Sequence, residues 1–113
     1  MAKQARVERP TKKSEYTLQF ASNQARKGWT DLVATHRNAM TETWDYLTRN
    51  PMLVSPRNYR LKGELAIVTR DGVDHERWQH KPTLHGSARV WFYVEGQVVH
   101  LEAVHTAHPN ETK

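Results

Sequence analysis

The sequence contains no cysteine, and it has only five glycines and five prolines among its 113 residues. Without cysteine the chain can form no disulfide scaffold, no thiol nucleophile and no thiolate metal site, which is compatible with a reducing compartment. No apolar run approaches the roughly 20 residues that span a bilayer, and the first residues lack the apolar core of a secretory signal. These absences predict a cytoplasmic protein with no membrane partner.

Familiar catalytic motifs are missing as well. The sequence has no glycine-rich phosphate loop, no nucleophile elbow and no His-Glu-x-x-His zinc motif. His105 and His108 have the spacing of two metal ligands but lack a third and a fourth, so we predict neither a metal site nor a cofactor. Six of the seven histidines follow residue 74. Because histidine titrates near neutrality, this half of the chain can support acid/base chemistry.

The net charge of +5 is concentrated at the start of the chain. Residues 1–14 hold five Lys and Arg residues, including Lys12 and Lys13, against a single carboxylate. This segment has few apolar residues, and we expect it to be a flexible basic arm that precedes one domain at residues 15–113. Such an arm either raises affinity for a polyanion or acts only as a solubilising tail.

The first half of the domain has the pattern of a strand followed by helix. Residues 16–20 alternate apolar and polar side chains as a half-buried strand does, and Ser22 or Asn23 can cap a helix. Apolar residues then recur at three- and four-residue spacings up to Asn50, which predicts a core-facing helix or a helical hairpin broken at Asn38. The residues of this stripe are Trp29, Leu32, Val33, His36, Met40, Trp44 and Leu47.

The second half of the domain has strand patterns. Residues 59–69 suit a short strand or a packed loop, Asp71-Gly72 suits a turn, and residues 75–81 suit a strand with Gln79 and Lys81 on one face. The order of elements predicts an α+β fold, with an N-terminal strand and a helical hairpin packed on a small, mostly antiparallel sheet. The helices would cover one face of this sheet and leave the other available.

The strongest local pattern is a terminal β-hairpin around Glu95-Gly96. If these two residues form the loop, Phe92 faces Val99 and Val90 faces Leu101, which gives one apolar face that also holds Ala88 and Ala103. The opposite face would then carry Arg89, Trp91, Tyr93, His100 and Glu102. A face with these side chains suits a flat, anionic ligand.

Four segments of the chain resemble the RelE/ParE toxin superfamily. They are YRLKGEL at residues 59–65, WQHK at residues 78–81, ARVWFY at residues 88–93, and residues 98–113, which end in HTAHPNETK. The resemblance covers residues 16–113 and is greatest to actinobacterial RelE-type chains, described as cytotoxic translational repressors. It implies a compact RelE-like microbial RNase fold that cuts mRNA at the ribosome. It also implies a cognate antitoxin as partner, which we expect to be a helix-turn-helix protein encoded nearby.

The resemblance also implies roles for individual residues. Arg89 and Lys81 stand where RelE-like toxins place an arginine and a lysine on the scissile phosphate, and Gln79 stands where the archetypal toxin has a second lysine. The tail offers His105, His108 and Lys113 near the cut, as in the HigB and YoeB branches. The implied reaction is attack by a 2′-hydroxyl, which leaves a 2′,3′-cyclic phosphate and a 5′-hydroxyl. Lys81 and Arg89 would stabilise negative charge, and His105 or His108 would exchange protons.

Further side chains are candidates for RNA contact: Gln79, Trp91, Tyr93, Lys62, Lys113, Lys12 and Lys13. Trp91 and Tyr93 could instead pack against a loop, and Lys81 could be a solvated charge at a strand end. In the predicted register Arg89 lies opposite Glu102, so a surface ion pair is its alternative role. His105 continues the alternation of the apolar face and could be partly buried.

Two other classes of function remain open from the sequence. A ParE-like toxin would inhibit DNA gyrase by binding, without RNase chemistry. A non-toxic nucleic-acid-binding module would use only the basic arm and the polar hairpin face.

Overall fold

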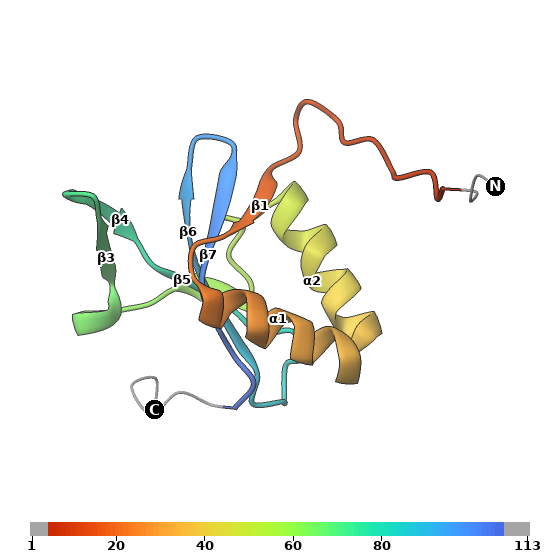
Figure 1. Cartoon of the computed structure of the whole chain (residues 1–113). Helices are drawn as coiled ribbons and strands as arrows, with labels where there is room; N and C mark the ends of the chain where they lie inside the picture. Colours follow the sequence, from red (N-terminus) through yellow and green to blue (C-terminus); the bar gives the residue numbers. More distant parts are fainter. Residues whose placement is uncertain (1–4, 108–113) are drawn as a thin grey trace.

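The computed structural model describes residues 5–107 (Figure 1). The elements in chain order are β1 (Thr17–Phe20), α1 (Asn23–Thr35), α2 (Arg37–Arg49), β2 (Asn58–Arg60), the 3-10 turn η1 (Gly63–Leu65), β3 (Ile67–Arg70), β4 (Val73–Glu76), β5 (Trp78–His80), β6 (Arg89–Glu95) and β7 (Val98–His105). Five strands form one sheet in the order β1-β7-β6-β5-β2, in which only the β1–β7 pair is parallel. Strands β3 and β4 form a separate two-stranded sheet. The predicted α+β class and mostly antiparallel sheet are confirmed.

The two helices form a hairpin whose first helix lies directly on β7. Ser22 caps α1, because its Oγ accepts a hydrogen bond from the Ala25 amide at 3.0 Å and donates one to the Glu102 carbonyl at 2.9 Å. A Cβ on Gly28 would lie 2.1 Å from the Val104 carbonyl oxygen, so only glycine allows this approach. The break between the helices falls at His36, and the predicted break at Asn38 is wrong. His36 has φ −138° and is exposed, which also removes it from the predicted core stripe.

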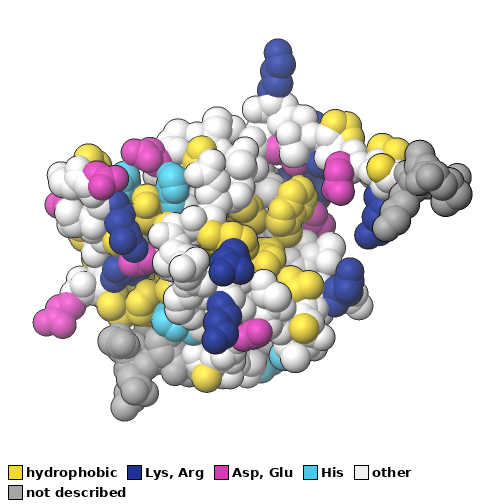
Figure 2. Space-filling model, in the orientation of Figure 1, with side chains coloured by type: hydrophobic (Ala, Val, Ile, Leu, Met, Phe, Trp, Pro, Cys, Tyr) yellow, Lys and Arg dark blue, Asp and Glu magenta, His cyan; other side chains and the backbone are white. Residues whose placement is uncertain are grey.

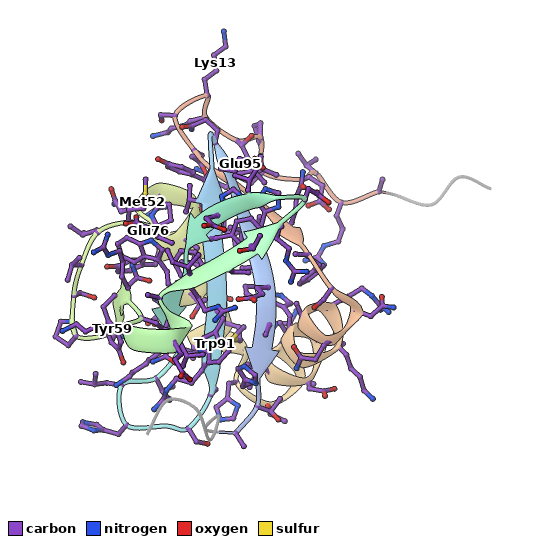
Figure 3. All side chains as sticks on the ribbon, turned by 90° about the vertical axis from the view of Figure 1, so that its left-hand side faces the viewer. Lys13, Met52, Tyr59, Glu76, Trp91 and Glu95 are labelled. Carbon is purple, nitrogen blue, oxygen red and sulfur yellow. The ribbon has the colours of Figure 1, made fainter. Side chains whose placement is uncertain are left out.

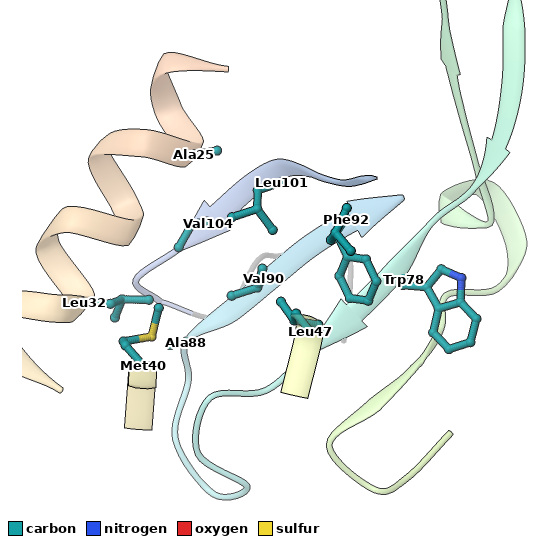
Figure 4. Packing of buried hydrophobic residues seen from close by; sticks show 11 residues of the cluster. Ala25, Leu32, Met40, Leu47, Trp78, Ala88, Val90, Phe92, Leu101 and Val104 are labelled. Atoms are coloured by element: carbon teal, nitrogen blue, oxygen red, sulfur yellow. The ribbon is translucent and has the colours of Figure 1, made fainter. Parts of the chain in front are cut away.

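The helices cover one face of the large sheet, where most of the apolar core lies (Figure 4). The buried members are Ala25, Leu32, Met40, Leu47, Trp78, Ala88, Val90, Phe92, Val99, Leu101 and Val104. Beside them is a small polar network. The His80 ring lies 3.1 Å from the Asn58 amide oxygen, and the Asn58 amide nitrogen donates to the carbonyls of Pro51 and Leu53. This network fixes the chain between α2 and β2 against the sheet.

The terminal hairpin forms, but with a different loop from the predicted one. Glu95 pairs with Val98, so the loop is Gly96-Gln97, and Gly96 has the φ of +59° that such a loop requires. From the loop as far as Leu101, each residue of β6 therefore pairs with a residue of β7 two positions later than predicted. Because side chains alternate between the two faces, a shift of two residues leaves each one on its predicted face. Thus Phe92 and Leu101 are buried as expected.

A β-bulge at Glu102 then changes the faces of the last residues of β7. Phe92 pairs with Leu101 but Trp91 pairs with Ala103, so Glu102 is the extra residue. Ala103 and His105 therefore leave the apolar face, where they were predicted, and Val104 takes the buried position. The bulge accompanies a paired carboxylate, since both oxygens of Glu102 accept hydrogen bonds from Arg77 at 2.7 and 2.8 Å.

The strand predicted over residues 75–81 is two strands that separate at Arg77. Strand β4 pairs with β3 around a two-residue turn in which Asp71 and Gly72 both have positive φ, as a type I′ turn requires. Strand β5 instead joins the large sheet between β2 and β6. The Arg77 amide donates to the Ala66 carbonyl at this corner. The β3–β4 hairpin thereby leaves the large sheet and packs over β6, where His75 stacks on Tyr93.

The described part of the N-terminal arm, residues 5–14, contains no helix or strand. Arg9 binds both carboxylate oxygens of Glu15, at 2.9 and 3.1 Å, and the Lys12 amide donates to the same carboxylate. These hydrogen bonds, that of Arg9 foremost, hold the pKa of the Glu15 carboxyl below its ordinary value. None of the helices described is long and apolar enough to cross a membrane.

Candidate functional site

The face of the large sheet that the helices leave free is not open to solvent along its whole length. The β3–β4 hairpin lies across it, as the view in Figure 3 shows. The expectation of a fully available face is therefore wrong. The sequence pattern could not show this, because the position of the hairpin depends on contacts between residues far apart in the chain.

Tyr93 is held at the centre of a three-ring stack. The His75 ring of β4 lies 4.6 Å from the Tyr93 ring at an interplanar angle of 26°, and the His100 ring of β7 lies 4.8 Å away at 15°. Tyr93 is 6% exposed, and its burial raises the pKa of the hydroxyl. Tyr93 therefore has little surface left for the predicted stacking on RNA bases. The alternative, packing against a neighbouring segment, is what the structure shows.

Trp91 and Gln79 are also buried, and they bind each other. The indole nitrogen of Trp91 donates to the Gln79 side-chain oxygen at 2.9 Å. The Trp91 ring has the Arg77 guanidinium 5.2 Å from its centroid and the His105 ring 4.7 Å away, edge on. Gln79 is 3% exposed and Trp91 8% exposed. Little of either side chain is therefore exposed for the direct RNA contact that the sequence predicts.

Arg89 and His105 are brought together across β6 and β7. They are direct register partners. The predicted Arg89–Glu102 pairing is wrong because the displaced loop shifts the partner of Arg89 by two residues and the bulge shifts it by one more, and Glu102 pairs with Arg77 instead. Arg89 is not the expected surface residue, since it is 7% exposed. Its Nη1 donates to the carbonyls of Gly86 and Ala88, at 2.8 Å each. Its Nε is buried and has no hydrogen-bond partner among the described residues.

Lys81, directly after β5, continues the row that Arg89 and His105 form across the end of the sheet. It follows His80, whose partner is Val90, so its position is next to that of Arg89 at the same end of the sheet. The Lys81 ammonium lies 5.5 Å from the centroid of the Tyr59 ring. The Tyr59 hydroxyl accepts a hydrogen bond from the Gln79 amide at 2.9 Å. Tyr59 was missed as a site residue, since a single tyrosine in a short strand gives no sequence signal.

Arg57 adds a further cation behind Lys81. Its Nε and Nη2 donate to the carbonyls of Lys81 and Pro82 at 3.4 and 2.5 Å. None of the carboxylates in residues 5–107 lies within 4.0 Å of the side-chain nitrogens of Arg57, Lys81 or Arg89. No carboxylate of the described residues therefore neutralises the positive charge at this end of the sheet, which is the electrostatic requirement for binding an anion.

The other predicted site residues lie apart from this row or outside the described residues. Lys12 and Lys13 are exposed, and Figure 3 places Lys13 far from Trp91. Lys62 is exposed on the segment between β2 and η1. His108 and Lys113 lie outside the described residues. The structure thus brings together Lys81, Arg89 and His105, with Gln79 and Trp91 packed beside them.

Two further observations complete the description of this site. Within residues 5–107, no group of three or more His, Asp or Glu side chains is arranged to hold a metal ion. Comparisons of the chain with protein-family models, with curated proteins and with solved structures gave no match. What points to a function in this chain is therefore the set of side chains at this end of the sheet and the resemblance in its sequence.

Proposed function

We propose that this protein is the toxin of a toxin–antitoxin pair and acts as a ribosome-dependent mRNA endoribonuclease. One observation carries the proposal: Arg89 and His105 are register partners on β6 and β7, Lys81 directly follows the neighbouring strand β5, and the two permanent cations have no carboxylate partner in the described chain. This arrangement supplies what phosphodiester cleavage by an internal 2′-hydroxyl needs. The required groups are positive charge for the phosphorane and a group that titrates near neutrality for the proton transfers.

The environments of the three side chains assign them different tasks. Lys81 is partly exposed, and its ammonium can bind a phosphate oxygen directly. Arg89 is engaged with its own loop, so we assign it a stabilising charge behind the phosphate rather than a direct contact. His105 exchanges protons, with its ring oriented by the edge-on contact with Trp91. His108 remains a second candidate for this role.

The reaction then proceeds without a further reactant besides the RNA. A base, for which we propose His105, removes the 2′-hydroxyl proton, and the 2′-oxygen attacks the adjacent phosphorus. The bond from phosphorus to the 5′-oxygen breaks, and an acid returns a proton to that oxygen. The products are a 2′,3′-cyclic phosphate and a 5′-hydroxyl. In this proposal a cognate antitoxin restrains the protein until it is released.

The test is a cell-free translation reaction that contains the full chain and a defined mRNA. We expect translation arrest and new RNA ends of these two chemical types, and we expect Lys81→Met and His105→Gln to reduce cleavage at least about 100-fold. Lys27→Met is the matched control, because Lys27 is an exposed lysine on α1, on the other side of the sheet.

Arrest with intact mRNA would overturn the proposed chemistry, and normal translation would overturn the proposed target. Supercoiling by purified DNA gyrase should continue in the presence of the protein. Its inhibition would favour the ParE-like alternative.

A further inference from the structure

A groove of about 770 Å³ lies at the β2 edge of the large sheet. Its apolar walls are Val54, Leu61 and Trp78, and Tyr59 and Lys62 also line it. Val54 is 67% exposed, although it is a large aliphatic side chain. The groove is therefore an apolar surface that remains accessible in the folded protein.

Tyr59 connects this groove to the row of cations. It lines the groove, and the Lys81 ammonium lies 5.5 Å from the centroid of its ring. Its hydroxyl is held by Gln79, which is held in turn by the Trp91 indole, and both partners are buried. The ring of Tyr59 is thus fixed in position, with the phosphate-binding lysine adjoining the groove.

The charge around the groove is suited to a polyanion. Lys62 and Lys81 have no carboxylate within 4.0 Å in the described chain. The one carboxylate that lines the groove, that of Glu76, is neutralised by an ion pair with Arg60, which lines it too. An apolar peptide would gain nothing from these unpaired cations. A single-stranded nucleic acid would make two favourable interactions, because its phosphates can bind the lysines and its flat, weakly polar bases can pack in the apolar groove.

We propose that this groove binds an unpaired nucleobase of an RNA strand whose backbone lies at Lys81, with Lys62 contacting a flanking phosphate. This inference rests on the proposed function, because it assumes that RNA is the ligand. It adds a base-binding subsite outside the row of Lys81, Arg89 and His105. It also gives Gln79 a defined task as a positioning residue for Tyr59.

The experiment measures binding of the full chain to a fluorescent hexaribonucleotide and to a strand of equal length that lacks bases at the central positions. Val54→Glu places a carboxylate in the groove at an exposed position. Leu53→Glu is the matched control, because Leu53 is 56% exposed in the same loop and does not line the groove. We expect Val54→Glu to weaken binding of the intact strand roughly fivefold to 100-fold, and Leu53→Glu to weaken it less than about twofold.

The base-free strand separates base binding from simple charge repulsion. It should bind the wild type and the Val54→Glu variant within about twofold of each other, whereas Lys81→Met should weaken binding of both strands. Equal effects of Val54→Glu and Leu53→Glu, or equal losses for the two strands, would overturn the subsite and leave the proposed function standing. Failure of the wild type to bind the intact strand, or no effect of Lys81→Met, would also overturn the subsite, whereas the proposed function is decided by the translation reaction.

A second variant tests the positioning role of Gln79. Tyr59→Phe removes only the hydroxyl that accepts the hydrogen bond from Gln79, and we expect it to weaken binding of the intact strand while the base-free strand is unaffected. A loss of equal size for both strands would contradict this role. Circular dichroism of each variant establishes that it is folded before binding is compared.

Discussion

Arg89 and His105 are direct partners across β6 and β7, although an uninterrupted hairpin would place them on opposite faces of the sheet. The extra residue at Glu102 brings them to the same face. It also leaves the Glu102 carboxylate beside Arg77, at the base of the β3–β4 hairpin. One irregularity in β7 thus arranges both the proposed site and the segment that covers the sheet.

The Arg77–Glu102 pair should contribute much more to stability than the Arg60–Glu76 pair. The side chains of the first pair are 13% and 11% exposed, and those of the second are 56% and 55% exposed. We expect Glu102→Gln to lower the free energy of unfolding by roughly 2 kcal/mol, because it leaves the charge of Arg77 buried without its carboxylate partner. Glu76→Gln should cost less than about 1 kcal/mol. Urea denaturation of the two variants measures both, and equal losses would contradict the argument.

His80 should make the protein less stable in mild acid. Burial, reinforced by the positive charge of Arg57, lowers the pKa of His80 from 6.5 to about 4. Between these values the unfolded chain binds the proton and the folded protein does not, so stability falls as the pH falls from 6.5 to about 4. The loss from this one residue is of the order of 3 kcal/mol, and it does not increase further below that window.

Urea denaturation at a series of pH values tests this prediction. Replacing His80 by glutamine should remove most of the dependence within the window, whereas replacing the exposed His36 should not. An unchanged pH dependence in the His80→Gln variant would show that other groups cause the loss.

Arg89→Met should destabilise the protein. The guanidinium is buried and satisfies the carbonyls of Gly86 and Ala88, so its removal should cost roughly 1–3 kcal/mol. Lys81→Met, at a partly exposed position, should cost less than about 1 kcal/mol. Thermal unfolding of the two variants is the measurement. If the ranking is reversed, the contacts of Arg89 do not hold the loop before β6.

The basic arm should act on RNA binding through charge alone. Lys12 and Lys13 are exposed, and Figure 3 places Lys13 far from Trp91, which packs beside the proposed site. We therefore expect the double Gln variant to lower the slope of log affinity against log salt by up to about two units. Cleavage by the bound protein should stay unchanged. A loss of cleavage at saturating RNA would show that the arm enters the site.

The sequence predicts the fold class because its strongest patterns are local. The cap at Ser22 or Asn23, the apolar stripe up to Leu47 and the apolar face around Phe92 each depend on neighbouring residues. The cap is Ser22, Phe92 is buried as predicted, and the stripe is confirmed except at His36. The two-residue displacement of the hairpin register does not change which side chains face the core, since side chains alternate with a period of two. The break at His36 differs by only two residues from the predicted one.

The site was harder to predict because it depends on distant contacts. The bulge accompanies a pairing of Glu102 with Arg77, 25 positions earlier in the chain. Burial of Trp91 and Tyr93 depends on where the β3–β4 hairpin packs on the large sheet. The alternation of residues within β6 does not predict the position of that hairpin. Tyr59 becomes part of the site only because β2 joins β5. The residues that gave the resemblance were therefore easier to identify than their surroundings.

The free face of α1 and the outer edge of β1 present a different situation. Figure 2 shows hydrophobic side chains between β1 and the helices, and Phe20 is 44% exposed beside Trp29. Strand β1 carries no charged residue, and β7 is its only neighbour in the described chain. Strand edges of this kind are where unwanted pairing between copies begins. Production of the protein at high concentration should therefore be limited by self-association at β1, and a lysine in place of Gln19 is the change that would counter it.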